Sequence, residues 1–221
     1  GGPVMLGDDI DRICEERLSL IKKVFPRTSE IATPVDLFDS PYPGYPRVFH
    51  LPVETDWANW DVVGILNFDA EPYSRVIPLA DFGLEPESEY IVWEFWNEQY
   101  TGVTSGYLRV EVPPRGARLY RVCRLVDHPQ VLGTDMHVLQ GQVELSRVAW
   151  DAATMTLSGS ASRPAGEMGN VFVRAPKGLF VRNPEGLWIA KDAVDECLII
   201  GRRFHFGSDA QAWAIEFGVL E

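Results

Sequence analysis

The chain has 221 residues, of which 46% are hydrophobic and 24% charged, so it can fold around one large core or two of about a hundred residues each. Its 32 acidic residues outnumber 20 Lys and Arg, and the net charge of -12 argues against a nucleic-acid partner because such a surface repels phosphate. No apolar run approaches the ~20 residues of a membrane helix, so no membrane partner is expected, and the separated Cys14, Cys123 and Cys197 predict buried free thiols.

The first predicted element is a helix. Residues 3–6 form a short apolar run, and apolar residues then recur at helical spacing over 10–25. Asp8 or Asp9 is expected to cap the N-terminus of this helix, and Pro26 is expected to end it. Since the following residues supply no obvious partner for its broad apolar face, we expect the helix to fold back on the β-structure, pair with a second copy in a homo-oligomer, or be disordered.

The rest of the chain predicts β-structure. Residues 1–46 end in a connector with five prolines over 26–46. Short runs separated by turn residues then predict an antiparallel β-sandwich over 47–126 and a second all-β domain over 127–221. The predicted fold class is therefore mainly β, with one N-terminal helix followed by two antiparallel β-sandwich-like domains. Strands are expected at 47–53, 60–68, 74–79, 90–96, 106–112, 117–125, 142–150, 155–162, 169–175, 178–183, 194–200, 202–207 and 211–217.

Three segments resemble a known family in the order in which that family places them. They are GGPVMLGDDIDRICEERLSLIKKVFP, WDVVGILNFDAEPYSRVIPLADFGL and YIVWEFWNEQYTGVTSGYLRVEVPPRGARLYRV. They resemble the last barrel strand and helix, the first sandwich hairpin, and the aromatic strand with its Pro-Pro-x-Gly corner in the α-galactosidase (melibiase) clan of glycoside hydrolases. Arg115 stands where that corner commonly has a His. The resemblance implies that 1–46 ends a catalytic barrel and that the natural N-terminus lies upstream, so no compartment is predicted.

The resemblance also implies a function. The clan consists of retaining α-glycosidases whose two catalytic aspartates lie on earlier barrel strands, and no residue here matches either one. We therefore expect no catalytic residue and an inactive chain by itself. Its expected function is that of a non-catalytic C-terminal β-domain region that packs against and completes the upstream catalytic barrel of the same polypeptide. The alternatives are a free-standing carbohydrate-binding or adhesion β-module, and a purely structural interaction domain.

Aromatic residues offer the clearest candidate binding site. Apolar sugar faces pack on aromatic rings, but strand alternation turns Ile91 and Trp93 one way and Val92 and Trp96 the other, so one set must fill a core. We therefore expect mostly packing roles in this group, and Trp57 and Trp60, near a loop, are the best candidates for carbohydrate binding. The group also includes Tyr90 and Tyr100.

The polar residues predict no metal, no cofactor and no acid–base pair. Asp8 and Asp9 are paired carboxylates but fit a helix cap better. The sequence supplies no partner His, nucleophile or metal for an acid–base pair formed by Glu94 and Glu98 or by Asp56 and Asp61. The histidines at 128, 137 and 205, with Asp127 or Asp135, match no compact metal motif. The sequence also contains no nucleotide-binding or nucleophile-elbow motif.

Overall fold

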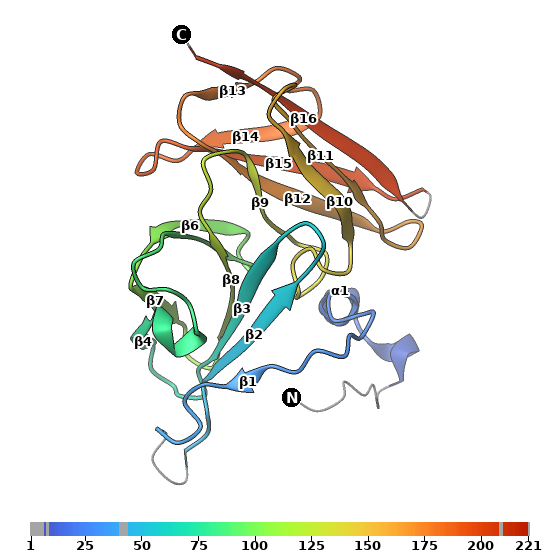
Figure 1. The fold of residues 1–221 in the computed structure, drawn as a ribbon. Coiled ribbons are helices and arrows are strands. Elements are labelled where there is room, and N and C mark those ends of the chain that lie inside the picture. The colour runs from blue at the N-terminus through green and yellow to red at the C-terminus, as the bar shows by residue number, and fades with distance from the viewer. Residues whose placement is uncertain (1–6, 8, 40–43, 208–209, 221) are drawn as a thin grey trace.

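Successive side chains of a strand point to opposite faces of its sheet, and two sheets of this fold carry apolar side chains on both faces. Neighbouring layers cover these faces, so that the molecule consists of four stacked layers (Figure 1). The structure is a computed structural model that describes residues 7, 9–39, 44–207 and 210–220. Its first part contains η1 (Ile10–Arg12), α1 (Glu15–Lys22), β1 (Thr33–Pro34), β2 (Val48–Glu54), β3 (Asn59–Leu66), β4 (Tyr73–Pro78), η2 (Leu79–Phe82), β5 (Tyr90–Glu94), β6 (Gln99–Thr104), β7 (Tyr107–Val112) and β8 (Ala117–Arg124).

The second part of the chain contains only strands among its described elements. The predicted mainly β fold, with one N-terminal α-helix and antiparallel sheets, is therefore confirmed for the residues that the structure describes. These strands are β9 (Gln130–Thr134), β10 (Leu145–Asp151), β11 (Thr156–Ala161), β12 (Met168–Ala175), β13 (Leu179–Val181), β14 (Leu187–Lys191), β15 (Leu198–His205) and β16 (Gln211–Val219).

The first two layers are a six-stranded sheet, ordered β1-β2-β3-β8-β5-β6, and a two-stranded ribbon of β4 and β7. They enclose a core in which Val63, Ile65 and Val92 of the sheet share one cluster with Leu108 and Val110 of the ribbon. Since successive side chains point to opposite faces of a strand, the intervening residues of the sheet face the other way and need a second cover.

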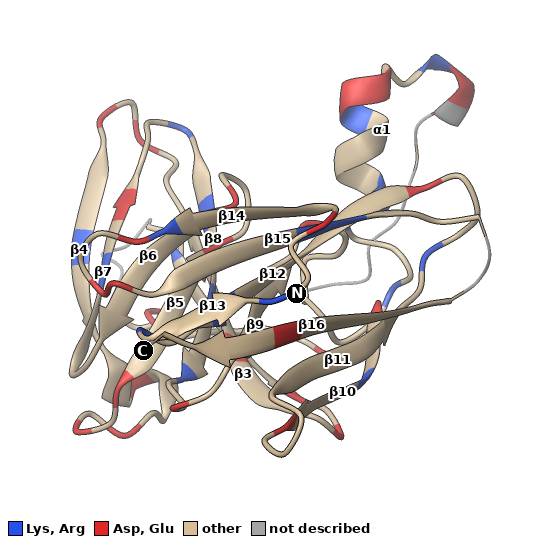
Figure 2. Ribbon diagram, turned by 90° about the horizontal axis from the view of Figure 1, so that it is seen from above, with Lys and Arg blue, Asp and Glu red and all other residues tan. Residues whose placement is uncertain are grey.

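The third and fourth layers form the second sandwich. The inner sheet has the order β14-β15-β12-β9 and the outer sheet the order β10-β11-β16-β13. Val171 and Ile200 of the inner sheet pack with Trp213 and Ile215 of the outer sheet. Figure 2 shows that charged residues are concentrated in turns and at strand ends, so the strand interiors are left largely for apolar packing.

A middle layer joins the two sandwiches. Trp60, Ile91 and Trp93 from the six-stranded sheet pack in one buried cluster with Leu132 and Phe172 from the inner sheet. Residues on both sides of the predicted boundary at 127 thus contribute to one core layer. The alternation predicted around Val92 holds, and both faces of β5 are buried: one in the first sandwich, the other in the middle layer.

The predicted helix over 10–25 is wrong in its extent. Cys14 has an extended backbone and separates η1 from α1, so Cys14, rather than Asp8 or Asp9, precedes α1 as its N-cap residue. Asp9 instead forms an ion pair with Arg12 at 3.2 Å. Asp8 and the apolar run 3–6 lie outside the described residues. Cys14 is also exposed, against the prediction of a buried thiol, whereas Cys123 and Cys197 are buried as predicted.

The segment between β9 and β10, residues 135–144, ties the end of α1 to the rest of the fold; we call it the junction segment. None of the α1 residues is buried, and Leu20 is 50% exposed, so the helix body packs little of its apolar surface. Its end folds back. Among the hydrogen bonds of the junction segment, one runs from Val138 N–H to the Lys23 carbonyl (2.9 Å) and one joins His137 Nε2 to the Pro26 carbonyl (3.1 Å). Another runs from Trp60 Nε1–H to the Leu139 carbonyl (3.1 Å).

Several predicted strands need correction. Residues 194–200 and 202–207 were expected as two strands, but β15 runs unbroken through 198–205 because both faces of the inner sheet are covered. Four further strands, β1, β6, β9 and β14, were not predicted at all.

Candidate functional site

A groove opens where the inner sheet extends beyond the cover of the six-stranded sheet. Its cavity volume is about 580 Å³. The floor comes from β12, β14 and β15, and one wall comes from Asn97 and Glu98 in the turn between β5 and β6. We call it the Trp188 groove.

The floor is built from one row of the inner sheet. The register pairs Trp188 with Gly201, Gly201 with Phe172 and Phe172 with Gly133, so these four residues lie side by side on one face. A Cβ at Gly133 would lie 2.9 Å from Trp93, and one at Gly201 would lie 3.3 Å from the Trp188 ring. The glycines therefore leave room for the indoles to lie over the sheet.

This row changes from core to surface along its length. Trp93 is 2% exposed and its ring centroid is 4.5 Å from that of Phe172, whereas Trp188 is 58% exposed. The exposed indole is held by a row that continues into the middle layer. It is thus an aromatic surface open to solvent, the kind of surface on which the apolar face of a pyranose ring packs.

Polar side chains surround the indole. Arg203 and Asn170 are paired in the register and occupy the next row on the same face. The Asn170 side chain donates to Asp135 Oδ2 at 2.6 Å, which fixes its orientation and leaves its own oxygen open. Arg203, Glu98 and the Asn97 side chain have no hydrogen-bonding or ionic partner among the described residues, so donors and acceptors remain for a ligand.

The wall is held in place by a buried carboxylate. Glu94, at the end of β5, accepts hydrogen bonds from the backbone N–H of Asn97 (2.8 Å) and of Trp96 (3.3 Å). Glu94 also accepts one from Leu119 N–H on β8. These bonds shape the turn and place Glu98 in a left-handed conformation, with φ 51°. Glu94 thus has a structural role, because it holds the turn that carries Glu98.

The acidity of Glu98 is weakened by its position. Partial burial raises the pKa of Glu98, and the nearby negative charge of Asp135 raises it further, while Lys23 acts in the opposite direction. A carboxyl group in this setting takes up a proton more readily than a Glu free in water, and when protonated it can donate as well as accept a hydrogen bond.

The structure brings Trp57 and Trp60 together, with ring centroids 5.1 Å apart. Trp60 is 2% exposed, however, and the Arg121 guanidinium lies over its ring at 3.9 Å, so Trp60 offers no free face to a sugar in this conformation. Trp57 is partly buried and lines a separate cavity at the junction of the two halves. Carbohydrate binding at Trp57 and Trp60 stays a prediction, and of this pair only Trp57 presents an accessible ring edge.

The other expected polar groups have local roles. His128 stacks on Trp150 with parallel rings 5.8 Å apart, while His137 belongs to the junction segment. Asp61 accepts a 2.6 Å contact from His50 Nε2, which is a pairing within the β2–β3 hairpin.

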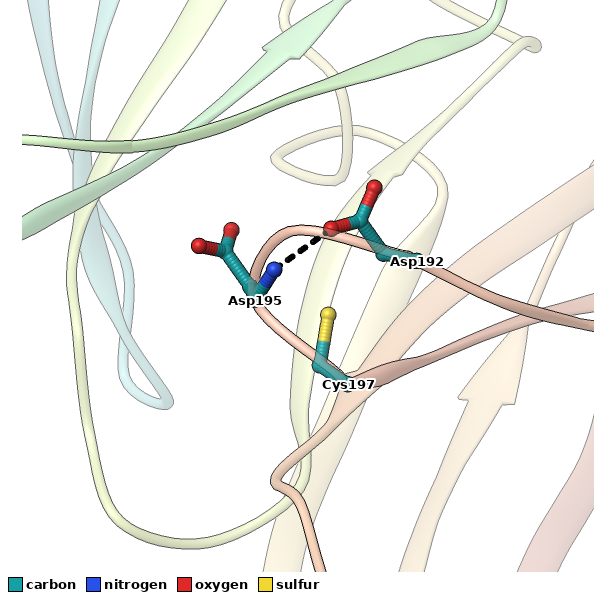
Figure 3. A group of neighbouring side chains, drawn as sticks. All are labelled: Asp192, Asp195 and Cys197. Carbon is teal, nitrogen blue, oxygen red and sulfur yellow. Dashed lines mark hydrogen bonds between the residues drawn. The ribbon is translucent and has the colours of Figure 1, made fainter.

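One group of potential metal ligands is found among the described residues, formed by Asp192, Asp195 and Cys197 (Figure 3). Their ligand atoms lie within 4.8 Å of one another. The carboxylates, however, already accept hydrogen bonds within the protein. Asp192 Oδ1 accepts one from the Asp195 N–H at 2.8 Å, and Asp195 Oδ2 accepts one from the Tyr100 hydroxyl at 2.6 Å. Burial raises the pKa of the Cys197 thiol, which keeps it protonated. We interpret the group as a structural contact that attaches β6 to the turn between β14 and β15.

No protein-family model matches the chain, and no curated protein sequence matches it. Within the part that the structure describes, no helix has the length and apolar character needed to span a membrane. Sequence reasoning missed Trp188 because 187–191 was not recognised as a strand, although the Pro-Glu-Gly turn before it was a usable indication.

Proposed function

We propose that this chain is the non-catalytic β-structured region of an α-galactosidase-like glycoside hydrolase, and that it holds carbohydrate in the Trp188 groove. The single observation that carries the carbohydrate part is the exposed Trp188 ring, which lies beside Gly201 and is bordered by the side chains of Arg203, Glu98 and Asn97, unpaired among the described residues. Such a combination of an aromatic face with planar polar side chains suits a neutral sugar, because the ring packs on the apolar C–H face and the polar groups bind the hydroxyls.

The enzyme part of the proposal is supported by the sequence resemblance of the first 125 or so residues. The same resemblance supports an upstream catalytic barrel as partner, and one structural observation favours it: α1 carries Leu18, Leu20 and Ile21, yet none of its residues is buried. A barrel packed on this helix would cover that surface. A free-standing carbohydrate-binding module, the alternative, would use the same groove without that partner.

Calorimetric titration of the purified chain tests the carbohydrate part. The probes are galactose, melibiose, raffinose and galactan-type oligosaccharides at concentrations up to about 10 mM, which detects a Kd near 1 mM. We expect binding, and we expect Trp188→Ala to weaken it about tenfold or more, since a central aromatic residue dominates contact energy. The matched control is Tyr107→Ala, another exposed ring (54%) that lies on β7 outside the groove.

Two results would overturn this function. The first is the absence of heat with every probe. The second is an equal loss of affinity in both variants, which would place the sugar elsewhere. Urea unfolding of both variants separates loss of the site from loss of the fold, and we expect the exposed substitutions to change the unfolding free energy by no more than about 0.5 kcal/mol.

A further inference from the structure

A second cavity lies between the two halves of the molecule, about 400 Å³ in volume. It shares no lining residue with the Trp188 groove. Its walls come from the β2–β3 turn, from β8, from the connection 126–131 and from β10 and β11. It is therefore enclosed by parts of both sandwiches, a common position for a ligand site.

Aromatic rings from both halves line this cavity. Trp57 comes from the β2–β3 turn, and Trp150 comes from β10. The His128 ring lies parallel to Trp150 at 5.8 Å, with an interplanar angle of 1°, and connects the 126–131 segment to β10. Together with Val148 and Leu157, these rings suit a small ligand with a flat apolar body.

The charge of the lining is unlike that of the chain as a whole. The net charge is -12, yet no Asp or Glu occurs among the described residues that line the cavity, while Arg121 and Arg124 both do. Arg121 is 1% exposed. Burial lowers the pKa of Arg121, and the nearby Cys123 and buried Glu144 raise it, but no described carboxylate lies within ion-pair distance of it. Its Nη1 donates to the carbonyl oxygen of Gln140. A buried cation without an ion pair is unfavourable, so an anion beside it would be stabilised.

Two further donors in the same place lack acceptors. Arg121 Nε and Trp57 Nε1 are buried and have no hydrogen-bond partner. The guanidinium lies over the Trp60 ring at 3.9 Å and 5.5 Å from the Trp57 ring, so it is held by aromatic contacts that leave part of its hydrogen-bonding capacity unused. An oxygen anion is the group that would use it.

We propose that this cavity binds a small, flat organic carboxylate. The aromatic rings pack against the apolar part of the ligand, and Arg121 forms an ion pair with its carboxylate group. The site does not depend on sugar binding at the Trp188 groove, so the two can fail separately. Arg124, which is exposed and forms a 3.6 Å contact with Glu85, contributes positive potential at the mouth rather than a fixed contact.

Calorimetry with benzoate, and with benzamide as the neutral control of the same shape, tests the charge requirement. We expect benzoate to bind with a Kd near or below about 1 mM and benzamide to bind at least about tenfold more weakly. Arg121→Met should abolish this preference, and Trp188→Ala should leave it unchanged. Equal binding of the two probes, or no binding of benzoate up to about 10 mM, would overturn the proposal.

A second measurement locates the ligand even if Arg121→Met fails to fold. Cys123 lines the cavity, whereas Cys197 is buried outside it. In a Cys14→Ser background, alkylation by iodoacetamide is followed at each thiol by peptide mass spectrometry. Saturating benzoate should slow alkylation of Cys123 about tenfold or more, and more than that of Cys197, which shares only the general stabilisation that a bound ligand gives the fold. Unchanged alkylation of Cys123 would show that benzoate does not occupy this cavity.

Discussion

Trp93 of β5 and Phe172 of β12 pack against each other in the middle layer with ring centroids 4.5 Å apart, and this contact joins the two halves of the molecule. Aromatic pairs add about 0.5–1.5 kcal/mol beyond the area they bury. Because the two rings come from segments on either side of residue 127, their contact couples the folding of one half to that of the other. A single unfolding transition is the expected consequence.

Phe172→Ala should lower the free energy of unfolding by about 3–5 kcal/mol, since it leaves a cavity beside Trp93. Urea unfolding followed by tryptophan fluorescence measures the change. Phe38→Ala is the matched control, because it makes the same chemical change at a ring that is 95% exposed, and it should stay within about 0.5 kcal/mol of the parent. Similar losses in both variants would contradict a special role for the middle layer.

Alanine at the two glycines of the aromatic row should have different effects. At Gly133 the new Cβ would lie 2.9 Å from buried Trp93, so Gly133→Ala should destabilise the fold by about 1–3 kcal/mol. At Gly201 it would lie 3.3 Å from exposed Trp188, whose ring can move. Gly201→Ala should therefore cost little stability but weaken sugar binding about tenfold. Unfolding and calorimetry on both variants check this, and the reverse ranking would refute the description of the row.

Acid should loosen the attachment of α1 through His137. Nδ1 accepts the Leu139 N–H and Nε2 donates to the Pro26 carbonyl, so the ring is neutral in the folded state. Burial, with a smaller effect of Arg163, lowers the pKa of His137 from 6.5 to about 4, against the opposing effects of the hydrogen bond to the Pro26 carbonyl and of Glu30. The stabilisation is complete above the unfolded pKa of 6.5 and is lost as the pH falls toward 4.

The expected difference is about 2 kcal/mol between pH 7 and pH 4, allowing for partial solvent access. His137→Gln should remove that part of the pH dependence. Unfolding curves at several pH values provide the measurement. Identical pH profiles for parent and variant would show that His137 is not the group responsible.

Glu144 should act in the opposite direction. It is 1% exposed, and burial raises its pKa despite the hydrogen bond that it accepts from the Thr134 hydroxyl. A raised folded pKa means that ionisation weakens the fold as the pH rises through the unfolded value of 4.5 and beyond. The stability of Glu144→Gln relative to the parent should therefore increase from pH 4 to pH 8. A difference that is flat or falls with pH would contradict this.

The sequence predicted best where side-chain alternation decides the outcome. The opposite facing of Ile91 and Val92 follows from the geometry of a strand, and it correctly indicated that aromatic residues around them would be packed. Alternation does not reveal what covers each face. Trp60 illustrates this limit: its Nε1–H donates to the Leu139 carbonyl and Arg121 lies over its ring, contacts that its position near a loop in the sequence does not indicate.

The Trp188 groove could not be predicted because its parts come from distant segments. No regular sequence spacing links Glu98, Asn170 and Arg203. The register of β12 with β15 brings Asn170 next to Arg203, and the β5–β6 turn places Glu98 beside them. The helix was overextended for a local reason: Cys14 adopts an extended conformation inside a run of helical periodicity. Periodicity indicates which face is apolar and does not detect such a break.

The floor and the wall of the Trp188 groove differ in how well they tolerate substitution. The floor belongs to the row that includes Gly133 and Phe172, so altering it would disturb the core. The wall is a short turn whose backbone is hydrogen-bonded to Glu94. The side chains of its outer residues, Asn97 and Glu98, are exposed and do not belong to the core. New ligand preferences can thus be introduced by exchanging the tip of one loop, while the scaffold beneath it stays untouched.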